Sequence, residues 1–188
     1  HFVSRKAMNI DGLGYKINTH LINLGYVKKV ADLFKLERYE TELKSLEGFG
    51  EKSIDNLFAS INNARKPKLE TFINALGIPE VGETTASSLA RHFKEFQSLR
   101  SASLDDLLQL DSIGEVVAKN IIKFFKNDPV GIDDLLDQME IENYVASADS
   151  HLDGVRIVIT GSFTEFSRDE LKDIIKSKGG IPSSSVSA

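Results

Sequence analysis

The stretch Asp11-Gly12-Leu13-Gly14 recurs 36 residues later as Glu47-Gly48-Phe49-Gly50: an acidic residue, a glycine, an apolar residue and a second glycine, followed by a helical pattern. The second glycine returns at Gly82 and Gly114, after two further steps of 32 residues. A regular period of this size is typical of a repeated supersecondary unit. We therefore expect four copies of a helix-hairpin-helix unit, with the first to fourth hairpins at residues 11–14, 47–50, 79–82 and 111–114.

Each hairpin is predicted to bind a phosphate through its backbone. Gly12 and Gly48 permit a positive φ at the turn, and the second glycine lets the backbone approach a ligand closely. A branched side chain at Gly50 is therefore expected both to strain the turn and to block that approach. Bare N–H groups at the start of a helix lie at the positive end of its dipole, which suits a phosphate. An apolar residue anchors each hairpin in its helix pair: Leu13, Phe49, Val81 and Ile113.

The four hairpins differ in the polar side chains that follow the second glycine and could bind the phosphate. Lys16 and Lys52 lie in the first helical turn, where a cation is mildly unfavourable unless an anion is nearby. The third copy offers Thr84 and Thr85 instead, and the fourth offers only valines, so we expect the fourth hairpin to be mainly structural. The predicted DNA-binding residues are Gly12, Leu13, Gly14, Lys16, Gly48, Phe49, Gly50, Lys52, Ser53, Gly82, Thr84, Thr85 and Gly114.

Simpler interpretations of these residues stay open. A glycine can merely link or end helices in a bundle. Glu51, Glu83 and Glu115 follow the glycines and could be metal ligands, but first-turn carboxylates are also favoured by the helix dipole. The basic run 65–68 either contacts a phosphate or is solvated. Because no nucleophile with an adjacent base can be recognised, no catalytic, cofactor-binding or metal site is predicted in this chain.

The rest of the pattern predicts a mainly α fold with a short α/β end. Apolar residues at three- and four-residue spacing predict about ten short helices in a helix-hairpin-helix domain at residues 1–145. Residues 146–151 are small and polar, as in a linker. Val155–Thr160 predicts a strand, Arg168–Ser177 a helix, and Ile181 the start of a second strand. Such an incomplete segment cannot cover both faces of its strand, so we expect it to be disordered, loosely docked or paired with another chain.

Composition and charge restrict the partners. The net charge is −5, yet residues 1–75 carry +3, residues 76–150 carry −8 and residues 151–188 are neutral. Because phosphate binding depends on local charge, the first part is the better DNA face. Cysteine is absent, which excludes thiolate zinc sites, and no apolar run approaches the roughly 20 residues of a membrane span. We expect a cytoplasmic, nucleoid-associated protein without membrane contacts, and the start at His1 indicates a piece of a longer chain.

On these motifs, residues 2–58 closely resemble bacterial NAD-dependent DNA ligases. The similarity continues through residues 81–86, while Val158-Ile159-Thr160-Gly161 and Gly179-Gly180 resemble the opening of a BRCT domain. The resemblance implies a C-terminal ligase fragment with four helix-hairpin-helix motifs at residues 1–145 and a truncated BRCT domain at residues 152–188. It also implies NAD, magnesium and zinc as cofactors of the intact enzyme, with nicked duplex DNA and the remaining ligase domains as partners in replication and repair.

The adenylated lysine of that family lies in a K-x-D-G motif, which this chain lacks. Its Asp-Gly pairs begin at Asp11 and Asp153, and the residues two positions earlier are Asn9 and His151. The resemblance thus implies an inactive fragment that holds duplex DNA without reading its sequence. Two alternatives stay open: a tandem-hairpin module of a repair nuclease or branch-migration protein, and a BRCT-type protein-interaction scaffold.

Overall fold

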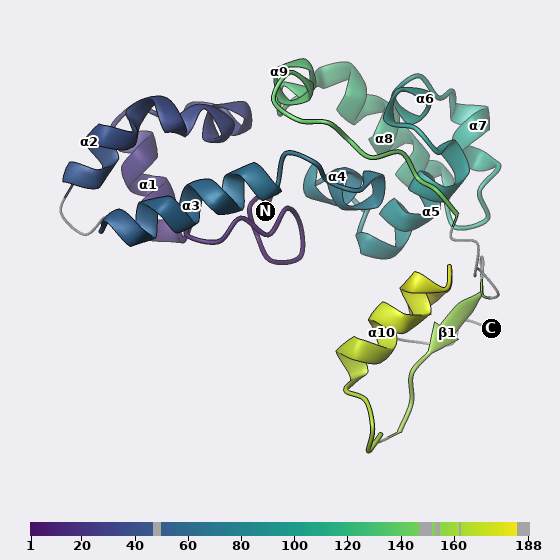
Figure 1. Cartoon of the computed structure of the whole chain (residues 1–188). Helices are drawn as coiled ribbons and strands as arrows, with labels where there is room; N and C mark the ends of the chain where they lie inside the picture. Colours follow the sequence, from purple (N-terminus) through teal and green to yellow (C-terminus); the bar gives the residue numbers. More distant parts are fainter. Residues whose placement is uncertain (47–49, 147–151, 153–154, 162, 184–188) are drawn as a thin grey trace.

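A computed structural model of the chain describes residues 1–46, 50–146, 152, 155–161 and 163–183, with Lys16 described by its backbone alone. The described part of the first 146 residues holds ten helical elements, as the sequence predicts (Figure 1). They are α1 (Tyr15–Asn23), the 3-10 helix η1 (Val30–Tyr39), α2 (Glu40–Ser45), α3 (Glu51–Asn63), α4 (Leu69–Ala75), α5 (Glu83–Phe93), α6 (Phe96–Arg100), α7 (Leu104–Leu108), α8 (Glu115–Asn127) and α9 (Ile132–Leu136). The fold is therefore mainly α, and one buried apolar cluster extends from Phe2 to Met139.

The helices form two groups that lie side by side in Figure 1. The N-terminal half (residues 1–64) holds α1, η1, α2 and α3, and the C-terminal half (residues 69–141) holds α4 to α9. Helices on either side of a hairpin pack on each other: α2 on α3, α4 on α5, and α7 on α8. The first hairpin differs, because residues 2–8 before it form hydrogen-bonded turns and not the expected helix.

The segment η1 also departs from the expected α-helix. Its buried residues are Ala31, Leu33, Phe34 and Leu36, so two pairs of them are three residues apart. A 3-10 helix has three residues per turn, which places both pairs on the side that faces the core. A carboxylate near its start is used locally, since Oδ2 of Asp32 accepts hydrogen bonds from the backbone N–H of Lys28 and of Lys29, each at 3.0 Å.

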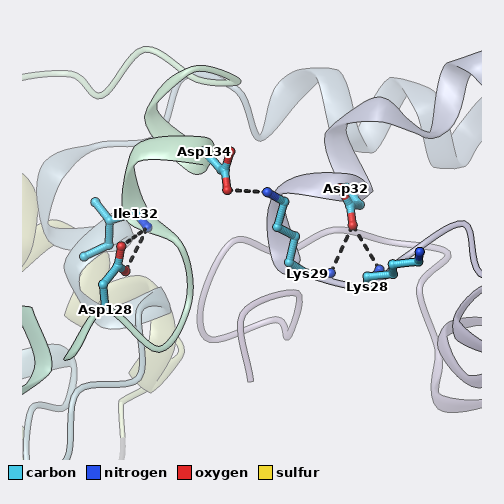
Figure 2. A network of polar contacts seen from close by, with 6 residues as sticks. All are labelled: Lys28, Lys29, Asp32, Asp128, Ile132 and Asp134. Carbon is cyan, nitrogen blue, oxygen red and sulfur yellow. Dashed lines mark hydrogen bonds and ion pairs between the residues drawn. The ribbon is translucent and has the colours of Figure 1, made fainter.

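The two halves are joined by more than the chain between them. Residues 138–142 return along the α3–α4 connection, where Glu140 N–H donates to the Arg65 carbonyl at 2.7 Å and Glu142 N–H donates to the Pro67 carbonyl at 2.9 Å. Figure 2 shows a second link, an ion pair between Lys29 at the start of η1 and Asp134 on α9. Asp128 fixes the start of α9, because both of its carboxylate oxygens accept from Ile132 N–H.

The end of the chain forms the expected βαβ unit. Strands β1 (Arg156–Val158) and β2 (Ile181–Ser183) pair in parallel, with Arg156 opposite Ile181, and α10 (Arg168–Ser177) connects them. Ile175 and Ile181 are buried, and β2 packs against α5. Of the three arrangements expected for this segment, the described residues show docking on the helical domain. The strand is shorter than Val155–Thr160 because the described ladder pairs three residues of β1 with β2.

Candidate nucleic-acid interface

The second glycine of every hairpin is the N-cap of the helix that follows. Gly14, Gly50, Gly82 and Gly114 have φ values of −66°, −70°, −95° and −83° and extended ψ values, and none of these N-caps provides a side-chain cap. A Cβ atom added at any of the four would meet nothing within 4 Å. The first turns of α1, α3, α5 and α8 therefore open onto free space with their N–H groups uncapped by a side chain.

Two other helices show the opposite arrangement. Ser103 caps α7, where its hydroxyl accepts from Asp106 N–H at 3.2 Å, and Ser167 caps α10 by accepting from Glu170 N–H at the same distance. In both cases the carboxylate of the third helical residue bonds back to the serine N–H. The chain thus closes these two helix starts with its own side chains and leaves the starts of α1, α3, α5 and α8 for another acceptor.

The negative φ of Gly50 corrects one expectation. A branched residue can adopt φ −70° and ψ 150° without strain, so the turn at Gly50 does not require glycine for its conformation. The open space around the Cα is the property that only glycine provides here. A side chain at this position would act by occupying the space that a ligand needs.

The residue two positions before each N-cap glycine sets the turn. Gly12 has φ 91°, as expected, and Gly48 lies outside the described residues. In the third hairpin, Glu80 takes the same left-handed conformation with φ 65° although it is not a glycine, while Ser112 of the fourth hairpin does not have a positive φ. The third hairpin therefore reproduces the backbone turn of the first, and the fourth departs from it.

The apolar anchors lie where the sequence predicts. Leu13, Val81 and Ile113 are 5%, 6% and 4% exposed, whereas Phe49 lies outside the described residues. The first hairpin is held further against α3, because Asp11 N–H donates to the Ser60 hydroxyl at 2.8 Å. A Cβ added at Gly12 would lie 3.4 Å from Leu57 Cβ, so this hairpin packs directly on α3.

The polar candidates lie on the outside of these helix starts. Lys52, Ser53 and Thr84 are exposed and Thr85 is half-buried, while the side chain of Lys16 lies outside what the structure describes. Among the described residues, Lys52 has no carboxylate partner. Lys44 contrasts with it, since hydrogen bonds to Asp55 and Glu40, at 2.8 and 2.7 Å, raise its pKa above the usual range. Lys44 therefore holds α2 to α3, and Lys52 remains available to a ligand.

The glutamates that follow the glycines do not converge on a metal site. Glu115 pairs with Lys119 at 2.5 Å, which lowers the pKa of the Glu115 carboxyl, and Glu83 pairs with Lys176. Within the described residues no group of three histidine or acidic side chains could hold a metal ion. The first hairpin carries Tyr15 in this position, and its side chain is 86% exposed. The alignment of the four copies could have identified this exposed tyrosine, which the predicted site omitted.

The basic run at residues 65–68 is partly structural. The Arg65 guanidinium donates to the carbonyls of Phe34 and Gln138 at 2.6 and 2.9 Å and to the Asn62 amide oxygen at 3.0 Å. Lys66 pairs with Glu140 at 2.9 Å, and this hydrogen bond lowers the pKa of the Glu140 carboxyl. The sequence left two interpretations of this run open, a phosphate contact and a solvated charge. Neither describes Arg65, whose side chain joins the N-terminal and C-terminal halves of the helical domain.

Comparison with known proteins connects this geometry to a family. A family model described as the helix-hairpin-helix motif matches residues 71–131, which contain the third and fourth hairpins. The whole chain aligns with proteins named DNA ligase: 39% identity over 193 residues in Ruminiclostridium cellulolyticum, 42% over 197 residues in Halalkalibacterium halodurans and 41% over 194 residues in Francisella philomiragia. Each alignment covers 100% of this chain and 28–29% of the relative.

Two further facts bear on the assignment. The chain spans less than a third of the length of these curated relatives. In the part of the chain that the structure describes, no helix has the length and apolar character that crossing a membrane requires. Since the sequence match extends over every part of the chain and the helix-hairpin-helix model falls within it, the chain corresponds in sequence to one part of bacterial proteins named DNA ligase.

Proposed function

We propose that this chain is the part of an NAD-dependent DNA ligase that grips duplex DNA without reading its sequence. The observation that carries the proposal is the set of glycine N-caps, which open helix starts toward free space with no side-chain cap. Backbone N–H groups at such positions bind phosphate oxygens, and phosphate contacts orient a protein on DNA independently of base sequence. The similarity to proteins named DNA ligase supports DNA as the source of the phosphate.

The hairpins contribute unequally to this grip. The first and second hairpins lie within residues 1–75, which carry a net charge of +3, and Lys52 is exposed beside its helix start. The third hairpin has the same turn but acidic neighbours, and the fourth lacks both the turn and a polar side chain at the position of Lys52. We assign the main contacts to residues 10–65 and a mainly structural role to the fourth hairpin.

In the parent enzyme, this grip would hold a nick in place for joining. Two hairpins that straddle the minor groove and hold both backbones keep the two ends in line, which lowers the entropy cost of the reaction. The chain has no K-x-D-G lysine for adenylation and no cysteine for a thiolate zinc site. We place the cofactors NAD, magnesium and zinc in other parts of the parent ligase and expect the isolated chain to be inactive in joining.

Comparison with the alternatives favours the ligase. A tandem-hairpin nuclease or branch-migration module would share the hairpins but not the residues after 152, and the ligase alignments extend through these residues. A cytoplasmic location beside the nucleoid and a role in replication and repair follow from the proposal.

Fluorescence anisotropy with nicked, intact and forked duplexes tests the proposal at several salt concentrations. Binding should depend steeply on salt, with little change when the base sequence is altered. A Lys52→Ala variant should bind every duplex more weakly and lose about one unit of salt slope, whereas Lys126→Ala, at the far end of α8, should not. Binding that is insensitive to salt, or restricted to one sequence, would contradict the proposal.

A further inference from the structure

The third hairpin lacks the positive charge that favours phosphate binding. Its turn and helix start carry Glu80 and Glu83, with Thr84 and Thr85 as the only other polar side chains. No lysine or arginine lies between Lys68 and Arg91, and Arg91 is in the last turn of α5, away from the hairpin. A phosphate that approached Gly82 would therefore meet two carboxylates without a cation from the hairpin itself.

The βαβ unit at the end of the chain brings cations to this position. β2 packs against α5, and Lys176 on α10 forms an ion pair with Glu83, the first residue of α5. Lys172 lies one turn earlier on the same face of α10, since residues four apart are neighbours on a helix surface. The Lys172 amine forms an ion pair with Asp169 at 2.8 Å, and the hydrogen bond in this pair, with a smaller attraction to Glu83, raises its pKa.

The ion pair leaves both the hairpin and the lysine accessible. The side chains of Lys176 and Glu83 are 47% and 63% exposed, so solvent reaches the amine while it contacts the carboxylate. The space around the Cα of Gly82 is open, and Thr84 is exposed. A phosphate at the start of α5 can therefore share the Lys176 amine with Glu83 without displacing a buried group.

We propose that α10 supplies the third hairpin with the cations that it lacks, so that Lys172, Lys176 and the start of α5 form one surface for the DNA backbone. This inference deepens the proposed function, on which it rests, because it gives the βαβ unit a share in DNA binding. With Lys176 paired to it, the Glu83 carboxylate is neutralised, and the helix dipole and the Thr84 hydroxyl can favour a phosphate.

Two substitutions that break the same ion pair test the proposal. Lys176→Gln removes a cation from the surface, so DNA binding by the full chain should weaken by about eightfold at 0.1 M salt and lose about 0.9 of salt slope, the value of one phosphate contact. Glu83→Gln removes the opposing carboxylate and releases Lys176, so binding should tighten. Lys172→Gln combined with Lys176→Gln should lose more slope than Lys176→Gln alone.

The opposite signs separate this proposal from simple docking. If the ion pair only attached the βαβ unit to α5, both single variants would change DNA affinity in the same direction, and that result would overturn the proposal. An affinity unchanged by the double lysine variant would overturn it too. Lys126→Gln on α8 is the matched control for the loss of one exposed charge, and circular dichroism checks that all variants fold.

Failure of this inference is distinguishable from failure of the proposed function. If the unmodified chain does not bind DNA, or Lys52→Ala leaves binding unchanged, the hairpin grip itself is wrong. If the unmodified chain binds and Lys52→Ala weakens binding, but the α10 lysines have no effect, only the contribution of α10 is wrong.

Discussion

Replacement of Arg65 by alanine tests whether this side chain holds the two halves of the helical domain together. The guanidinium makes three hydrogen bonds, to the Phe34 carbonyl, the Gln138 carbonyl and the Asn62 amide oxygen, and lies 5.6 Å from the centre of the Phe34 ring. It thereby connects η1, the end of α3 and the segment after α9. Alanine would remove all of these contacts at once.

The size of the effect follows from these contacts. Hydrogen bonds from a charged donor contribute about 1.5–3 kcal/mol each. Arg65 is half-buried, so water can replace part of what alanine removes, and we expect a total loss of about 3 kcal/mol. For a chain of this size, 1 kcal/mol lowers the thermal midpoint by about 2–4 °C, so Arg65→Ala should lower it by about 6–12 °C.

Thermal unfolding followed by circular dichroism measures this change. Lys66→Ala, one residue along, is the control, because the Lys66–Glu140 pair is exposed on both sides and should not alter the midpoint. Arg65→Lys should fall between the two, since lysine keeps the charge but cannot reach three acceptors with a planar fork. An Arg65→Ala midpoint equal to that of Lys66→Ala would refute the role assigned to Arg65.

Three further substitutions address the hairpins and the caps. Gly50→Val should fold normally, because valine adopts the φ of this position without strain. In a titration it should weaken DNA binding by about tenfold or more, which corresponds to the loss of at least one charged hydrogen bond. A stronger effect of Gly114→Val would reverse our ranking of the hairpins. Glu80→Gly relieves about 1 kcal/mol of backbone strain at the left-handed φ, and this gain offsets the larger backbone entropy that glycine has in the unfolded chain. The thermal midpoint should therefore stay the same, while DNA binding should tighten because a carboxylate is removed. Weaker binding would count against a phosphate at the third hairpin. Hydrogen bonds from the Ser103 hydroxyl and N–H lower the pKa of Asp106, so this carboxylate stabilises the fold above its unfolded pKa and stops doing so as the pH falls through its folded pKa. Asp106→Asn should therefore lower the thermal midpoint at pH 7, and the difference from the unmodified chain should disappear as the pH is lowered. A difference that stays constant in acid would exclude the cap as its cause.

The repeat of glycines was sufficient to predict the hairpins and the four helices that follow them. Its spacing places an N-cap at Gly14, Gly50, Gly82 and Gly114 because each glycine begins a run with helical periodicity. The βαβ order at the end of the chain was predictable for a similar reason, since β-branched and amphipathic runs alternate there. Both signals are local in the chain.

Features that depend on distant contacts were not predictable in this way. The role of Arg65 arises from carbonyls 31 and 73 residues away, which no local pattern reveals. Glu80 adopts a left-handed conformation because the hairpin around it requires that turn, although the missing glycine made the third copy look incomplete. The approach of Lys176 to Glu83 depends on how β2 packs on α5.

The proposed grip requires that the glycine-capped starts of the hairpin helices, α1, α3, α5 and α8, contact DNA. Backbone amide NMR of the full chain, titrated with a short duplex of arbitrary sequence, measures this directly. The amides of residues 50–53 and 82–85 should shift with DNA concentration, whereas those of residues 104–106, which follow the serine cap of α7, should not. If the amides after Ser103 shifted as much as those after Gly50, or if the glycine-capped turns did not respond, the account would be contradicted.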